Sequence, residues 1–281
     1  MADPLPNFLH LGPAKSGTTW LYRVLSQHPE VFLSPAKDLH FFNRCYDRGL
    51  DWYRTQFRGA GREHNVIGEV CPRYLSFGPA AERIRTCLGA DVRLMVTLRD
   101  PVSRAFSAYL DHRKHAEAAA TFRDTTRLLP QLIDDGRYAT QLRGYLEHFG
   151  RASLRIALFD DLQADPQVFL DGVTDWLGLA RQPLARGQLE AQLPASEARW
   201  SPLAKLVKHG STWARSHDAL GAVGVIKHSA LVQRALYRPL NAELPQLPPQ
   251  DAAFIRDQLD AEVTALETDF ALPVKHRWNW S

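Results

Sequence analysis

The segment 7–27 constrains the fold of this chain more than any other. An apolar run over 7–11 predicts a short buried strand, and a helical pattern over 18–27 follows closely. The loop between them is bounded by Gly12 and Gly17. Such a loop presents backbone N–H groups at the N-terminus of a helix, where the helix dipole also favours anions. The segment therefore predicts a phosphate-binding loop.

The position of its lysine separates this loop from those that bind nucleoside triphosphates. The triphosphate pattern, G-x-x-x-x-G-K-[ST], places the lysine directly after the second glycine and uses the next hydroxyl to bind Mg²⁺. Gly12 and Gly17 keep the glycine spacing. The next positions hold Thr18 and Thr19, however, and the lysine, Lys15, lies inside the loop. This arrangement favours a single 5′-phosphate that carries a small anionic substituent.

Strands and helices alternate along the first 180 residues. Further strands are predicted at 31–33, 66–70, 92–98 and 154–159. Helices are predicted at 51–57, 79–88, 101–112, 121–134, 137–149 and 166–177. The alternation predicts an α/β fold of the P-loop type, with three layers and a central parallel sheet flanked by helices. We expect one domain over 1–281, with an α/β core at about 7–180 and a mainly helical or irregular cap at about 181–281. The cap ends in a helix over 250–268, and the aromatic tail 276–280 is expected to pack on the fold.

Composition restricts the class of protein and its partners. The chain has 281 residues, 45% hydrophobic and 23% charged, which is typical of a globular protein. A net charge of +3 suits an anionic ligand but does not indicate nucleic-acid binding. No signal peptide and no membrane span are expected from the apolar pattern. The cysteines are widely spaced and predict neither disulfides nor a metal site, so we expect a cytoplasmic location; the oligomeric state is left open.

A second candidate anion site follows the strand 92–98. Arg99 lies at the carboxyl end of this strand, and Asp100 and Pro101 are typical of a helix start. Ser107 lies two turns into that helix. The arginine fork and the hydroxyl suit a phosphate, although Arg99 alone would also fit a salt bridge. Together with the loop, the pair predicts a nucleotide phosphorylated at both ends of its ribose.

The segment 35–42 contains candidates for a general base. Asp38 and His40 lie just before the apolar pair Phe41 and Phe42. Either side chain can take a proton from a hydroxyl group. Alone, the segment would also fit a charged loop that enters the core through its phenylalanines.

These segments resemble sulfotransferases that use 3′-phosphoadenosine 5′-phosphosulfate (PAPS), above all the glycosaminoglycan and other carbohydrate sulfotransferases and their bacterial relatives. The resemblance rests on 12–19, on Lys37-Asp38-x-His40-Phe41-Phe42, and on Arg99-Asp100-Pro101 with Ser107. Weaker similarities are Glu69-x-x-Pro72-x-Tyr74, Gly136-x-Tyr138, Asp161-Leu162 and 176–179. The resemblance implies transfer of a sulfuryl group from PAPS to a hydroxyl of a carbohydrate-like or small natural-product acceptor. It also implies release of 3′-phosphoadenosine 5′-phosphate (PAP), without a metal.

The resemblance also assigns roles to individual residues. The 5′-phosphosulfate would be bound by Lys15, Ser16, Gly17, Thr18 and Thr19. Lys15 would in addition stabilise charge on the leaving oxygen, and Arg99 and Ser107 would bind the 3′-phosphate. Arg199 is our candidate for a C-terminal donor-binding loop.

Two positions depart from the family pattern. The carbohydrate branch usually has Glu where this chain has Asp38, which is one methylene shorter. Asp38 is our first candidate for the base, and His40 is its rival because a histidine serves in the branch that acts on phenols and alcohols. Cys71 stands where relatives commonly have Ser or Thr.

Two other classes of function compete with this interpretation. A P-loop kinase or other nucleoside triphosphate-binding protein requires a lysine directly after Gly17, which is Thr18 here. A non-catalytic module that binds bisphosphorylated adenosine would keep Lys15, Arg99 and Ser107 but would need no base.

Overall fold

The computed structural model of the chain describes residues 3–115, 117–189, 196–198, 237–239 and 246–280. About half of the predicted C-terminal cap, including Arg199, lies outside the described residues. In the part that is described, no helix has both the length and the apolar character needed to cross a membrane.

Five parallel strands form the central sheet, in the order β2-β3-β1-β4-β5. They are β1 Phe8–His10, β2 Val31–Leu33, β3 Val66–Val70, β4 Arg93–Leu98 and β5 Leu154–Leu158. In the central register, Leu9 of β1 lies between Glu69 of β3 and Leu94 of β4. All strand residues are buried or half-buried and most of them are apolar, as expected for a parallel sheet covered on both faces. The predicted α/β fold is confirmed.

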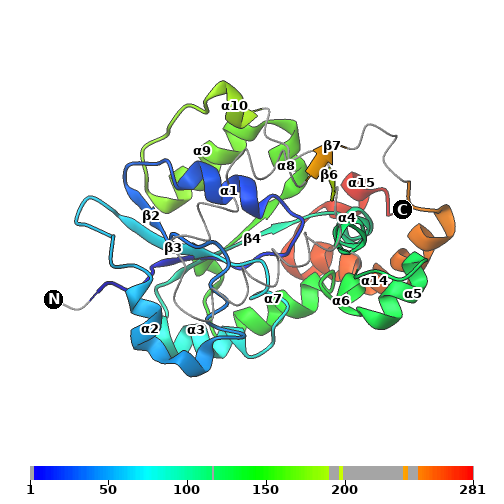
Figure 1. Cartoon of the computed structure of the whole chain (residues 1–281), viewed down its shortest axis with the longest axis horizontal. Coiled ribbons are helices and arrows are strands. Elements are labelled where there is room, and N and C mark those ends of the chain that lie inside the picture. Colours follow the sequence, from blue (N-terminus) through cyan, green and yellow to red (C-terminus); the bar gives the residue numbers. More distant parts are fainter. Residues whose placement is uncertain (1–2, 116, 190–195, 199–236, 240–245, 281) are drawn as a thin grey trace.

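Helices cover both faces of this sheet (Figure 1). The α-helices are α1 Thr18–Leu25, α2 Gly49–Thr55, α3 Ala80–Leu88, α4 Pro101–Lys114, α5 Phe122–Leu128, α6 Gln131–Asp134, α7 Tyr138–Leu146, α8 Phe159–Ala164, α9 Pro166–Leu177, α10 Arg186–Leu189, α14 Pro249–Phe270 and α15 Val274–Trp278. Short 3₁₀ turns lie at Tyr46–Arg48 and Arg151–Ser153. Helices α1 and α9 pack on one face around Phe8 and Met95. Helices α3, α4, α7 and α14 pack on the other around Leu9 and Leu94.

The strand order creates a switch point between β1 and β4. From β1 the chain passes through α1 to β2 on one side of the sheet, whereas from β4 it passes to β5 on the other side. The connections after two neighbouring strands therefore separate at their carboxyl ends, which is where open parallel sheets bind ligands. The loop 11–17 and Arg99 both lie at this point.

Some local predictions require correction. The helix predicted over 121–134 is divided into α5 and α6, because Pro130 interrupts it. Helix α8 was not predicted, since it follows β5 directly. Strands β6 (Ser196–Ala198) and β7 (Tyr237–Pro239) form an antiparallel pair where helical or irregular chain was expected. Three residues are too few to give a recognisable alternation.

The C-terminal segment agrees with the prediction. The helix expected over 250–268 is α14, and the tail that follows it packs on the fold. Trp278 and Trp280 are both buried. The indole of Trp280 donates to Asp100 Oδ1 at 2.9 Å, and that of Trp278 donates to Asp160 Oδ2 at 3.0 Å. The tail is thus tied to the residues that follow β4 and β5.

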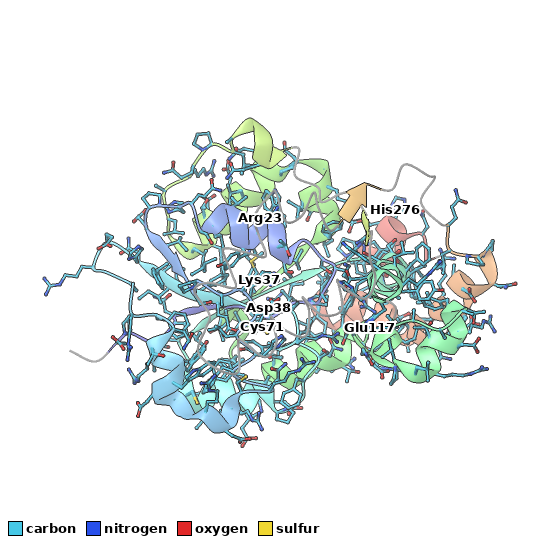
Figure 2. The ribbon with its side chains drawn as sticks, viewed as in Figure 1. Arg23, Lys37, Asp38, Cys71, Glu117 and His276 are labelled. Atoms are coloured by element: carbon cyan, nitrogen blue, oxygen red, sulfur yellow. The ribbon has the colours of Figure 1, made fainter. Side chains whose placement is uncertain are left out.

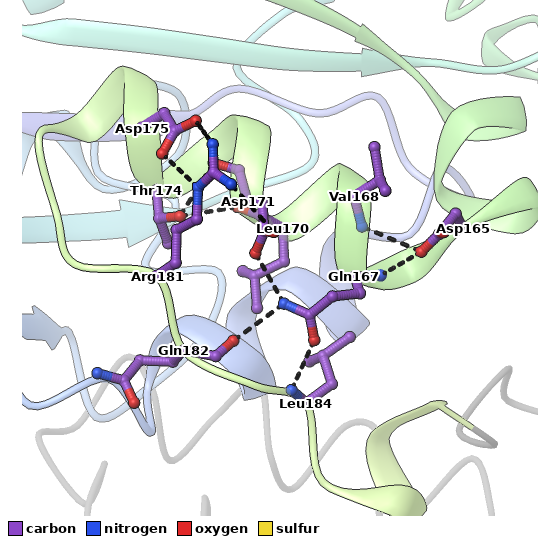
Figure 3. A network of polar contacts seen from close by, with 10 residues as sticks. All are labelled: Asp165, Gln167, Val168, Leu170, Asp171, Thr174, Asp175, Arg181, Gln182 and Leu184. Carbon is purple, nitrogen blue, oxygen red and sulfur yellow. Dashed lines mark hydrogen bonds and ion pairs between the residues drawn. The ribbon is translucent and has the colours of Figure 1, made fainter.

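A polar network fixes the chain that follows α9 (Figure 3). Arg181 forms a two-pronged ion pair with Asp175, at 2.9 and 2.7 Å. The side chain of Gln167 bonds the backbone of Gln182 and Leu184. These contacts hold the segment 181–184 against α9, and the chain then continues to α10.

Candidate active site

The loop after β1 has a backbone that requires its two glycines. Gly12, Lys15 and Gly17 all have positive φ, at 111°, 72° and 80°. A Cβ on Gly12 would lie 2.5 Å from the carbonyl oxygen of Pro72. A Cβ on Gly17 would lie 2.6 Å from the side chain of Leu162. The loop therefore packs tightly against the segments that follow β3 and β5.

Ser16 supplies a hydroxyl that fits an anion at this loop. Ser16 is 1% exposed, and its Oγ has no hydrogen-bond partner among the residues that the structure describes. Buried polar groups normally have a partner, so an unpartnered hydroxyl in a phosphate-binding loop fits a bound anion. Thr18 and Thr19 begin α1 directly after it, where backbone N–H groups lack acceptors within the helix. The donor set suits the 5′-phosphosulfate end of PAPS.

Lys15 is held by a residue of α4. Its ammonium lies 3.5 Å from Asp111 Oδ1, and both side chains are partly exposed. Partial burial would raise the pKa of the Asp111 carboxyl, but the charges of Lys15 and His115 hold it below its usual value. The side chain of Lys15 therefore extends from the loop towards α4.

Arg99 contacts the same loop. Its Nη1 donates to the backbone oxygen of Lys15 at 2.9 Å, and its guanidinium lies 4.8 Å from the ring centre of Phe159. Burial lowers the pKa of Arg99, but an arginine remains a cation. The contact with Lys15 uses one of five N–H donors. The structure thus brings together two of the predicted anion-binding residues.

Ser107 lies on the face of α4 that carries Asp111, because residues four apart share a helix face. Ser107 is half-buried. It is therefore on the side of α4 where Asp111 reaches Lys15.

The two candidate bases lie in one turn beside the end of β3. Figure 2 shows Lys37, Asp38 and Cys71 gathered at the middle of the molecule. The Lys37 ammonium lies 2.7 Å from Asp38 Oδ1, with the two side chains 11% and 24% exposed. His40 Nδ1 lies 3.6 Å from the Sγ of Cys71. Asp38 and His40 have φ values of 64° and 58°, in the left-handed region that non-glycine residues rarely adopt.

His10 is a residue whose role was not predicted. It is fully buried at the end of β1, and its Nδ1 accepts the N–H of Gly12 at 3.2 Å. Its Nε2 must then carry the proton and donate to Thr97 Oγ1 at 2.9 Å. Burial, with the charge of Lys37, lowers the pKa of His10 to about 3. The neutral imidazole therefore ties the loop to β4.

Glu69 is the second such residue, noted in the sequence only as part of a weaker motif. It is fully buried in β3. Its Oε1 accepts from the Leu39 N–H at 3.1 Å and from the Tyr74 hydroxyl at 2.8 Å, and its Oε2 accepts from the Tyr53 hydroxyl at 2.8 Å. Burial raises the pKa of Glu69 to about 7, and the charge of Asp38 adds to the rise. The sequence offered one signal for this residue, because Glu69 is a carboxylate inside the otherwise apolar run 66–70.

The fold and the site define an α/β protein with a phosphate-binding loop at the switch point of its sheet. Residues 5–197 match the family described as the sulfotransferase domain, and the chain belongs to that family. The predicted resemblance is confirmed, and the kinase alternative is set aside.

Known proteins similar to this chain include heparan sulfate enzymes and a bacterial sulfotransferase. Human heparan sulfate glucosamine 3-O-sulfotransferase 3B1 is 34% identical over 186 residues, 63% of this chain and 47% of that protein. Human heparan sulfate glucosamine 3-O-sulfotransferase 6 is 29% identical over 88% of this chain and 72% of that protein. The crystal structure of a sulfotransferase from Alicyclobacillus acidocaldarius superimposes with a TM-score of 0.60 at 26% identity, covering 82% of this chain and 96% of that one. The chain spans about half the length of the 3B1 relative.

Proposed function

We propose that this sulfotransferase moves a sulfuryl group from PAPS to a hydroxyl of a carbohydrate-like or small natural-product acceptor. The observation that carries the proposal is the buried hydroxyl of Ser16, which is next to Lys15 in the sequence and has no hydrogen-bond partner within the described part of the chain. It lies in a loop that the sequence alone predicts to bind a substituted 5′-phosphate. Membership of the sulfotransferase family supports the same chemistry.

The donor site is assigned to residues of the loop, to Arg99 directly after β4 and to Ser107 on α4. When bound, PAPS supplies a sulfuryl group activated by a phosphate leaving group. Ser16, Thr18 and the first N–H groups of α1 bind its 5′ end, together with Gly17 and Thr19. Lys15 would supply the cation that offsets the negative charge developing on the leaving group, as preorganised cations do in transition states. Arg99 and Ser107 bind the 3′-phosphate; Arg199 remains a candidate outside the described residues.

Asp38 is proposed as the base that takes the proton of the acceptor hydroxyl. Its carboxylate is fixed by Lys37 and stays partly exposed, so an acceptor can reach it. His40 is the alternative, two residues away in the same turn.

A pocket beside Lys15 supports a hydroxyl-rich acceptor. Its walls include Arg73, Asp111, Gln131 and Asp135. Arg73 Nη1 lies 3.0 Å from Asp135 Oδ2 in an ion pair. Lys15 Nζ lies 3.5 Å from Asp111 Oδ1 in a second ion pair. Carboxylates and an amide of this kind accept hydrogen bonds from hydroxyl groups. The names of the human relatives specify heparan sulfate glucosamine, which supports a carbohydrate-like acceptor.

The proposal is tested by following the label from sulfur-labelled PAPS into a panel of oligosaccharides, phenols and aliphatic alcohols. We expect the wild-type protein to label at least one class of acceptor and Lys15→Ala to lose that activity. Arg85→Ala, which removes an exposed charge on α3, is the matched control and should behave as wild type. Tight PAP binding without transfer to any acceptor would support the non-catalytic module instead. The cytoplasmic location and the single domain over 1–281 stay predictions.

A further inference from the structure

The turn that carries both candidate bases is strained. Asp38 and His40 have positive φ on either side of Leu39, which is 5% exposed. Non-glycine residues keep this conformation only where the surrounding structure imposes it. The contacts that impose it therefore also set the position of the reacting group.

The turn is attached to β3 by hydrogen bonds of two kinds. Asp38 donates its N–H to the backbone oxygen of Val70 at 3.1 Å. The next residue, Leu39, donates its N–H to the side chain of Glu69 at 3.1 Å instead. The N–H between the two strained residues is thus held by a side chain, which a substitution can remove.

Two tyrosines fix the Glu69 carboxylate and reach the same segment. Tyr53 and Tyr74 are fully buried, and each donates its hydroxyl to Glu69 at 2.8 Å. The Tyr53 ring stacks on Phe41 with 4.2 Å between centroids and 8° between planes. The Tyr74 hydroxyl also accepts the N–H of Phe42 at 3.4 Å. Glu69 and its two tyrosines therefore anchor both the turn and the residues that follow it.

Burial gives Glu69 a role different from that of Asp38. Its side chain has no exposed surface, so no acceptor hydroxyl reaches it, whereas the Asp38 side chain is 24% exposed. We propose that Glu69 is a positioning residue, which holds the 38–40 turn in its strained conformation and so places the base against the acceptor. The proposal rests on the proposed function, because it assumes that this turn carries the base.

Protonation of Glu69 would affect the turn directly. A protonated carboxyl still accepts the N–H of Leu39 through its carbonyl oxygen, but the hydrogen bond loses the negative charge that strengthens it. The groups that face Glu69 are Tyr53, Tyr74, Asp38 and Cys71, with Lys37 beyond Asp38. Its pKa of about 7 therefore predicts that Glu69 contributes to the pH dependence of kcat near neutrality.

The first test compares Glu69→Ala with Glu69→Gln, using PAPS and any acceptor found in the panel. Glu69→Ala should lower kcat by about tenfold or more with little change in KM for PAPS or in PAP affinity, because only the turn is released. Glu69→Gln can still accept from Leu39, so it should recover most of that kcat while losing the ionisation near neutrality from the pH profile. A kcat for Glu69→Ala within about twofold of wild type, or an equal loss for both variants, would overturn the proposal.

A second test does not depend on catalysis. Hydrogen exchange of the Leu39 amide should be protected in wild type and should speed up by about tenfold or more in Glu69→Ala, with the 12–19 loop unchanged. Unchanged exchange at Leu39 would refute the positioning role.

If wild type transfers no sulfuryl group, the proposed function fails, while this exchange measurement still decides whether Glu69 holds the turn. Tyr74→Phe, which removes one donor to Glu69, serves if Glu69→Ala does not fold: it should also speed exchange at Leu39, and unchanged exchange would again refute the role.

Discussion

The Nη1 atom of Arg99 donates a hydrogen bond to the backbone oxygen of Lys15 at 2.9 Å. The two residues are 84 positions apart in sequence and follow neighbouring strands, β1 and β4. The bond joins the loop assigned to the 5′ end of PAPS to the residue assigned to its 3′-phosphate. The two proposed anion sites are therefore joined by a hydrogen bond to the backbone of the loop.

This hydrogen bond gives a prediction for Arg99→Ala. PAP affinity should fall by about 100-fold, because a phosphate partner and the support of the loop are both lost. Affinity for adenosine 5′-phosphate, which lacks the 3′-phosphate, should fall only a few-fold. Calorimetric titration of both ligands measures the difference. Equal losses for the two ligands would show that Arg99 supports the loop without contacting the 3′-phosphate.

Lys15→Ala should reduce kcat by about 100-fold or more, since the charge on the leaving oxygen then lacks its cation. Stability should change little, because Lys15 is 31% exposed and its ion pair with Asp111 is a surface pair. Steady-state kinetics and thermal unfolding measure the two effects separately. Undiminished turnover would refute the role of Lys15.

Asp38→Asn should lower kcat by about 100-fold or more at pH 7 and leave PAP affinity unchanged, because the amide cannot take a proton. His40→Ala should have the smaller effect on kcat. The matched kinetics of the two variants decide between the candidates. Near-full activity in Asp38→Asn, with a large loss in His40→Ala, would show that His40 is the base and Asp38 is not.

Two buried groups predict opposite pH effects on stability. The pKa of His10 is lowered to about 3. Its contribution to the free energy of unfolding is therefore complete above its usual pKa of 6.5 and is lost as the pH falls towards 3. The pKa of Glu69 is raised from 4.5 to about 7, so its contribution is complete below 4.5 and is lost as pH rises through 7. Between pH 7 and pH 5 each contributes a change of about 2 kcal/mol, with opposite sign.

Denaturant unfolding at pH 5 and 7 tests this opposition. Glu69→Gln should lose stability on acidification relative to wild type, because only the effect of His10 remains. His10→Asn keeps an acceptor for the Gly12 N–H and should instead gain stability on acidification relative to wild type. If both variants follow the wild-type pH dependence, these pKa shifts are wrong.

The sequence was informative where the signal is local. The apolar runs bounded by glycine and proline predicted all five strands of the sheet, and the spacing of Gly12, Lys15 and Gly17 predicted the loop. Pro130 could have predicted the break between α5 and α6. Each of these features depends on residues that lie close to one another in the sequence.

The rest depends on contacts between distant segments. Glu69 meets Leu39 only because the chain after β2 runs along β3, and a buried carboxylate in an apolar run does not reveal its partners. Likewise, the bond between Arg99 and the Lys15 backbone follows from the pairing of β1 with β4. No pattern in either segment predicts such a contact.

The central claim is that the loop with Lys15 binds PAPS as its donor, and calorimetry tests it without knowledge of the acceptor. Titration of the wild-type protein with PAP, and separately with ATP and Mg²⁺, compares the two classes of ligand directly. The account predicts that PAP binds more tightly by about 100-fold, because it assigns a 3′-phosphate site to Arg99 and Ser107 and because Thr18, not a lysine, follows Gly17. Tighter binding of ATP with Mg²⁺ would contradict it.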